Sequence, residues 1–194
     1  TEKTFKMPEF CPSCGSKLVK PEKDVVWRCP NQKCFSRKLG QFEHFVSRPA
    51  FDIDGVGPKI VERFIDEGLV SDPADLFSLT EGDILPLERF ADKSARKIVA
   101  SIQSKKIVPF SRFIYALGIR NVGEKTSRDL ARRFNCWEDI AKASLDGLED
   151  IPDMGPISAQ AVFDWFKDQD NLLFLSKLSQ NGVGYSKDKT GTRL

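Results

Sequence analysis

The sequence has 194 residues, of which 40% are hydrophobic and 30% are charged. This length and composition suit one folded domain with its own core and a smaller appendage, and they exclude a chain that is disordered throughout. Apolar runs such as LLFL at 172–175 are far shorter than the roughly 20 residues of a membrane-spanning helix, and no secretory signal opens the chain. We therefore expect a cytoplasmic protein that does not bind membranes.

Charge is distributed unevenly along the chain. Residues 1–44 hold 9 Lys and Arg against 5 Asp and Glu, whereas residues 45–194 hold 21 against 23, which gives a net charge of +2. The longer part is too weakly charged to bind nucleic acid through bulk positive charge. Any DNA binding by this part must depend on local geometry.

Four of the five cysteines form a pattern typical of a zinc site. Two residues separate Cys11 from Cys14, four separate Cys29 from Cys34, and fourteen lie between the pairs. Four thiolates at this spacing suit tetrahedral Zn²⁺, and Gly15 can take the positive φ that helps the first pair to turn. The site is predicted to be structural because no ligand position stays open, and two disulfides of a secreted module are the alternative.

The segment between the cysteine pairs, DVVWR at 24–28, predicts a short strand within a small zinc finger. Basic residues surround it, and they either face phosphates or are simply solvated. One cysteine and one histidine remain. We expect Cys136 to be a small buried side chain rather than a nucleophile, and His44 to pack or to form hydrogen bonds, since the four-cysteine set is already complete.

A short pattern that begins at Gly55 recurs three more times. The copies are Gly55–Lys59, Arg89–Lys93, Asn121–Lys125 and Asp153–Ile157, which start 34, 32 and 32 residues apart. An aliphatic residue precedes each start by two positions, and an apolar residue follows it by nine positions (Ile53, Leu87, Ile119, Ile151; Phe64, Ile98, Leu130, Val162). A period of this length indicates one supersecondary unit that is used four times.

Each unit is predicted to be a helix, a tight turn and a second helix, with hairpins near 55–57, 89–91, 121–123 and 153–155. Gly, Asn or Asp at the first turn position and Gly at the third suit left-handed backbone geometry, and the apolar residue between them plugs the hairpin into the helix pair. Pro58 and Pro156 fall at the first helical position, where proline is tolerated. In the second copy Arg89 and Ala91 replace the glycines, so we expect a poorer turn with a mainly structural role.

This helix-hairpin-helix pattern leaves unpaired N–H groups at the start of the second helix, which is a site for a phosphate of the nucleic-acid backbone. A single copy could equally be a plain helical corner, but four copies favour DNA binding without sequence specificity. The candidate DNA-binding residues are Gly55, Val56, Gly57, Lys59, Lys93, Asn121, Gly123, Lys125, Thr126, Gly155 and Ser158.

The predicted fold is mainly α. A four-cysteine zinc-finger module occupies residues 1–44, a domain of four helix-hairpin-helix motifs occupies 45–184, and 185–194 is a polar linker. The segment FSRFIYALGI at 110–119 is expected to form a buried helix between two pairs of motifs.

The order of these motifs resembles the C-terminal half of bacterial NAD-dependent DNA ligases over roughly residues 8–184. The segments that carry the resemblance are CPSCGSKL (11–18), HFVSRPAFDIDGVG (44–57), ADLFSL (74–79), LPLERFADKSA (85–95), ALGIRNVGEKTSRDLARRF (116–134) and IPDMGPISAQAV (151–162). The family's hairpin pattern matches at Gly55, Gly57, Lys59, Gly123, Lys125 and Gly155.

The resemblance implies a piece of a longer chain, in which a nucleotidyltransferase domain and an OB-fold come first and a BRCT domain follows. It implies a monomer that clamps nicked double-stranded DNA through phosphate and minor-groove contacts, at the bacterial nucleoid. NAD and Mg²⁺ would serve the catalytic domain. The family's adenylated lysine lies in a K-x-D-G motif, but FDIDG at 51–55 lacks the lysine and KASLDG at 142–147 has the wrong spacing.

We therefore expect this chain to be inactive by itself and to have no catalytic residue. A non-enzymatic DNA-binding or protein-interaction scaffold of a recombination or repair complex is the alternative. The zinc site precedes the hairpins in this sequence, and this order favours the ligase.

Overall fold

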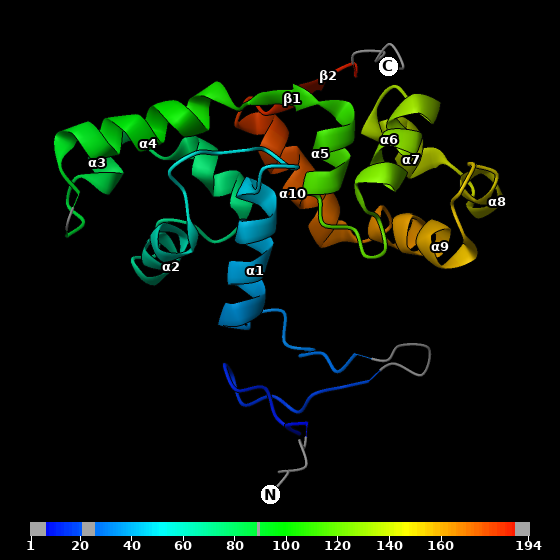
Figure 1. The fold of residues 1–194 in the computed structure, drawn as a ribbon, viewed down its shortest axis with the longest axis horizontal. Helices are drawn as coiled ribbons and strands as arrows, with labels where there is room; N and C mark the ends of the chain where they lie inside the picture. Colours follow the sequence, from blue (N-terminus) through cyan, green and yellow to red (C-terminus); the bar gives the residue numbers. More distant parts are fainter. Residues whose placement is uncertain (1–6, 21–25, 89, 189–194) are drawn as a thin grey trace, which may run out of the picture.

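The structure is a computed structural model that describes residues 7–20, 26–88 and 90–188 (Figure 1). It is mainly helical, as predicted. The helices are α1 (Phe35–Val46), α2 (Pro58–Asp66), the 3₁₀ helix η1 (Pro73–Ser78), α3 (Glu81–Ile84), α4 (Asp92–Ser104), α5 (Phe110–Ala116), α6 (Glu124–Arg133), α7 (Trp137–Lys142), α8 (Leu145–Glu149), α9 (Pro156–Trp165) and α10 (Gln169–Gln180). Within the described ranges, no helix is long and apolar enough to cross a membrane.

The helical part has a central layer and two flanks. Figure 1 shows α1, α5 and α10 in the middle, with α2, α3 and α4 on one side and α6 to α9 on the other. The first two hairpins lie on the first flank and the last two on the second. The repeated unit is therefore present as two tandem pairs, and α5 lies between them as predicted.

Aromatic side chains fill the core where the central helices meet. Phe45 stacks on Phe51 with ring centroids 4.3 Å apart, and Phe77 meets both rings edge-on. All eight apolar positions of the repeat, two before and nine after each start, are buried. The periodic apolar residues thus face one continuous core, which stabilises units that could not fold alone.

The junction between the two predicted domains lies inside α1. Cys34 is the residue that precedes α1, and Phe42 and Phe45 of the same helix are buried in the helical core. The boundary predicted between residues 44 and 45 therefore cuts a continuous helix. The zinc module is joined directly to the first helix of the first hairpin unit.

A two-stranded parallel sheet joins the segment before α5 to the segment after α10. Strand β1 (Ile107–Pro109) pairs with β2 (Gly184–Ser186). The Tyr185 ring packs on Phe110 and Phe113, and the Asp188 carboxylate accepts hydrogen bonds from Ser111. Residues 185–188 therefore belong to the helical domain rather than to the linker predicted there, because long-range pairing holds this polar segment.

The described part of the zinc module has little regular secondary structure of its own. Antiparallel bridges join Phe10 to Lys17 and Val19 to Arg28. Of the strand predicted over 24–28, residues 26–28 are described, and there only Arg28 forms a bridge. The cysteine cluster, rather than a sheet, is what can organise this module.

Candidate zinc site and nucleic-acid interface

The structure brings the four predicted zinc ligands together. The sulfur atoms of Cys11, Cys14, Cys29 and Cys34 all lie within 4.8 Å of one another. Two of the separations are 3.8 Å, from Cys11 to Cys34, and 3.4 Å, from Cys14 to Cys29. Tetrahedral zinc with Zn–S bonds of about 2.3 Å places its sulfurs about 3.8 Å apart, so this donor set fits a structural Zn²⁺ ion.

Backbone hydrogen bonds shape both halves of this site. Gly15 has φ +69° and donates its N–H to the Cys11 carbonyl at 2.8 Å, which forms the tight turn predicted there. The guanidinium of Arg37 donates to the carbonyls of Cys29 and Pro30. Arg37 on α1 therefore holds the second cysteine pair against the helix that leads into the core.

The thiols differ in their readiness to ionise. The hydrogen bond between Cys14 Sγ and the Ser16 hydroxyl lowers the pKa of Cys14 to about 6, and a backbone hydrogen bond from Arg37 lowers the pKa of Cys34. Loss of hydration raises the pKa of Cys29 to about 12. Cys14 therefore loses its proton to a metal more readily than Cys29 does.

The hairpins have the left-handed backbone predicted at their first position. Gly55, Asn121 and Asp153 have φ of +81°, +60° and +63°, while Arg89 of the second hairpin lies outside the described residues. The middle residues Val56, Val122 and Met154 are buried, and half-buried Phe90 stacks on Phe64 at 6.3 Å. The apolar residue at the middle position therefore packs against the protein interior in all four copies.

The third hairpin position does not use the left-handed geometry predicted for it. Gly57, Gly123 and Gly155 precede their helices with extended backbone, at φ of −85°, −92° and −76°, so none needs left-handed geometry. A Cβ atom at any of them would meet nothing within 4 Å. These glycines instead leave open space in front of a helix N-terminus, where a ligand can approach the backbone.

The described part of the second hairpin resembles the other copies in its backbone but not in its free amides. Ala91 precedes α4 with φ −95° and ψ 159°, which is close to the geometry of the glycines. Its N–H, however, donates to Ser94 Oγ at 3.0 Å. Ala91 therefore has regular geometry, but its amide is already used inside the protein.

Free amides lie at the start of the other three second helices. Before α6, the first intrahelical bond runs from Ser127 N–H to the Gly123 carbonyl at 2.9 Å. Among the described residues, no acceptor takes the N–H groups of Lys125 and Thr126, or those of Lys59 in α2 and Ile157 in α9. Such amides, together with the positive end of the helix dipole, favour an anion.

The third and fourth hairpins are fastened to each other. Lys125 Nζ donates to Asp153 Oδ2 at 2.5 Å, and the Ser158 hydroxyl donates to the Asn121 carbonyl at 3.1 Å. This contact raises the pKa of Lys125 and lowers that of Asp153, and both side chains remain about two-thirds exposed. Three predicted DNA-binding residues, Asn121, Lys125 and Ser158, thus also form bonds within the protein, which sequence reasoning missed. The one sequence feature that pointed to the ion pair was the acidic residue Asp153 at the first position of the fourth hairpin.

In the described part of the first tandem pair, no ion pair or hydrogen bond of this kind joins the two hairpins. Lys59 and Lys93 are exposed and have no ion-pair partner among the described residues. The two lysines therefore keep their charge available to a ligand, unlike Lys125.

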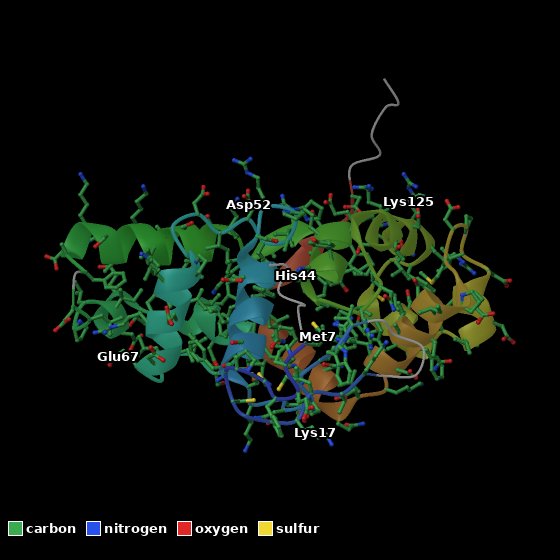
Figure 2. All side chains as sticks on the ribbon, turned by 60° about the horizontal axis from the view of Figure 1, so that its bottom comes forward. Met7, Lys17, His44, Asp52, Glu67 and Lys125 are labelled. Carbon is green, nitrogen blue, oxygen red and sulfur yellow. The ribbon has the colours of Figure 1, made fainter. Side chains whose placement is uncertain are left out.

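Asp52 anchors the first hairpin to the centre of the molecule. It has φ +54°, and its carboxylate accepts a hydrogen bond from Lys105 at 2.9 Å, which lowers the pKa of Asp52. Arg112 donates from Nε to the Ala50 carbonyl beside it at 2.8 Å. Asp52 and Lys125 lie on the same side of the molecule, opposite Lys17 of the zinc module (Figure 2).

The remaining histidine packs and forms a hydrogen bond, as predicted, whereas the remaining cysteine is less buried than predicted. The ring of His44 lies against Tyr115, with Nε2 at 2.7 Å from the Tyr115 carbonyl oxygen. Cys136 is half-buried at the start of α7, and burial raises its pKa, so it stays a thiol at neutral pH. The residues described around either side chain do not form a nucleophilic pair.

A four-cysteine module followed by two tandem helix-hairpin-helix pairs defines a class of zinc-containing helix-hairpin-helix proteins. Comparison with known families agrees with this architecture. The model of the NAD-dependent DNA ligase C4 zinc finger domain matches residues 10–34, that of a SAM-like helix-hairpin-helix tandem matches 48–104, and that of a helix-hairpin-helix motif matches 112–174.

Similar curated proteins are named DNA ligase. The chain is 40% identical over 182 residues to one from Desulfitobacterium hafniense (strain Y51), 37% over 186 residues to one from Chlorobium phaeovibrioides, and 41% over 183 residues to one from Phocaeicola vulgatus. These alignments cover 94%, 95% and 94% of this chain but only 28% of each relative. The chain thus matches the zinc-finger and helix-hairpin-helix region of NAD-dependent DNA ligases, and it spans little more than a quarter of the length of the relatives named here.

Proposed function

We propose that this region clamps the backbone of nicked double-stranded DNA for a ligase to seal. The observation that carries the proposal is the set of unpaired amides at the starts of α2, α6 and α9. Each set follows a glycine that has open space in front of it. A phosphate accepts hydrogen bonds from such amides without regard to base identity. This explains how a part with slightly negative net charge can bind DNA.

Each hairpin is proposed to contribute in its own way. Gly55, Val56 and Gly57 shape the first contact and Lys59 adds a cation, while Lys93 adds one beside the second hairpin. In the second tandem pair the proposed contacts are Asn121, Gly123, Lys125, Thr126, Gly155 and Ser158. Because phosphates carry no sequence information, we expect binding to depend on salt and on duplex shape.

The other parts of the ligase are proposed from the family alone. A nucleotidyltransferase domain would use NAD and Mg²⁺, and OB-fold and BRCT domains would complete a monomeric chain at the bacterial nucleoid. This chain has no K-x-D-G motif, so we predict that it accepts no AMP. Incubation with NAD and Mg²⁺ should leave its intact mass unchanged, whereas a gain of one AMP would contradict the assignment.

Salt titration of DNA binding tests the clamp. Lys59→Ala should weaken binding to nicked duplex and reduce the slope of log K against log salt by about 0.9, since one phosphate contact is lost. Lys125→Ala should change the slope less, because Asp153 already pairs with this lysine. Lys142→Ala, on exposed α7 outside the hairpins, is the matched control.

The salt titration also separates the clamp from a scaffold for protein partners. A scaffold would show no duplex binding even at low salt, and its behaviour would not change with Lys59→Ala. Equal slopes for the Lys59 and Lys142 variants would remove the first hairpin from the interface.

A further inference from the structure

The fourth hairpin presents an exposed apolar side chain where the other hairpins present a lysine. Ile157, the second residue of α9, is 69% exposed, the highest value among the large hydrophobic residues described. The corresponding residues of the other copies are Lys59, Lys93 and Lys125. Exposure of a β-branched apolar residue at this position does nothing for the core.

The backbone around Ile157 is fixed, so the side chain cannot turn inward. Met154, Ala159 and Val162 already fill the buried side of this hairpin and helix. The bonds from Lys125 to Asp153 and from Ser158 to Asn121 hold the fourth hairpin against the third. Ile157 therefore projects from a rigid edge, and a β-branched side chain in a helix loses little further freedom on binding.

We propose that Ile157 is a DNA contact that packs against the deoxyribose of the strand bound at the fourth hairpin. This inference rests on the proposed function. The N–H of Ile157 has no acceptor among the described residues, and the space in front of Gly155 is open, so a phosphate can approach the start of α9. The surface of a DNA strand between successive phosphates is the apolar C–H face of the sugar.

The two tandem pairs then bind by different forces. The first pair offers Lys59 and Lys93, which have no ion-pair partner in the described part of the chain and whose contribution falls as salt rises. The fourth hairpin offers amides and an apolar surface, and the free energy of burying an apolar surface is little affected by moderate salt. The apolar contact would keep a duplex in place at salt concentrations that weaken the charged pair.

Three substitutions in the full chain test this contact with nicked duplex across a salt titration. Ile157→Ala should weaken binding about fivefold, an order-of-magnitude value for losing part of a buried side chain. It should leave the salt slope unchanged. Ile157→Val should restore most of the affinity. Leu173→Ala, at a 67% exposed residue of α10, is the matched control and should have less than about a twofold effect.

Thermal unfolding of each variant checks that the fold is retained. An Ile157→Ala affinity equal to that of Leu173→Ala would overturn the inference while leaving the clamp intact. A change in salt slope with Ile157→Ala would also overturn it, because an apolar contact releases no counterions. Absence of DNA binding by the wild-type chain would instead refute the proposed function, and the inference with it.

Discussion

Replacing Asp153 with Asn should strengthen DNA binding, because the Asp153 carboxylate forms an ion pair with Lys125 in the unbound protein and so competes with a phosphate. The two side chains pair at 2.5 Å, and they are 67% and 68% exposed, so a phosphate can reach the same ammonium group. Asn has nearly the same shape and tolerates the φ of +63° found at this position. The substitution therefore removes a competing charge and leaves the hairpin in place.

The expected magnitude follows from counterion release. If the freed Lys125 neutralises one additional phosphate, the slope of log K against log salt becomes steeper by about 0.9. A rise from 50 to 200 mM salt then costs the variant about 3.5-fold more affinity than it costs the wild type. The gain in affinity should be largest at low salt. Thermal stability should hardly change, because exposed ion pairs contribute little.

Fluorescence anisotropy with a labelled nicked duplex measures both the affinity and the slope. Asp170→Asn, at an exposed carboxylate of the first turn of α10, controls for the general loss of negative charge. Equal slopes and affinities for the two variants would refute the idea that Asp153 competes with phosphate. Weaker binding by Asp153→Asn would mean that the carboxylate positions Lys125 for DNA.

The other predictions concern the metal and the centre of the fold. Removal of Zn²⁺ with a chelator should unfold residues 11–34, and an unchanged circular dichroism spectrum would count against a structural metal. The pKa of Cys29 is raised to about 12, so zinc must displace the proton of this thiol at neutral pH. The affinity for zinc should therefore fall about tenfold per pH unit on acidification from this thiol alone. Competition with a chromophoric chelator measures the zinc affinity, and an affinity that does not change with pH would contradict the prediction. Lys105 lowers the pKa of Asp52, so the pair stabilises the fold above the usual carboxyl pKa near 4 and stops doing so as pH falls through the lower folded value. Asp52→Asn should therefore reduce the free energy of unfolding by at most about 1 kcal/mol at pH 7 and by less at acidic pH. Urea titrations that give the same difference at both pH values would contradict this.

The features that sequence reasoning predicted correctly depend on neighbours in the chain. The cysteine spacing, the positive φ of Gly15, and the left-handed first position of three hairpins are local properties. The apolar positions of the repeat predicted the buried face of each unit. Its period also predicted the number of hairpins, because each unit repeats the same local pattern.

The predictions that differ from the structure concern places where segments distant in the sequence make contact. The predicted domain boundary cuts α1, which carries Phe42 and Phe45 into the core, and the first residues of the predicted linker pair in β2 with β1 across more than seventy residues. Ala91 needs no glycine because its backbone is extended, but its N–H is used inside the protein, which agrees with the mainly structural role predicted for the second hairpin. None of these contacts leaves a pattern within one unit.

The sequence alone determined the composition of the molecule: a four-thiolate module, four hairpin units, and the helix starts that can bind phosphate. The tertiary structure decided which of those groups are available. It pairs Lys125 with Asp153 and Ser158 with Asn121, leaves Lys59 and Lys93 unpaired among the described residues, and exposes Ile157. Local geometry is set by backbone preferences of a few residues, whereas the partners of a side chain depend on how separate units pack.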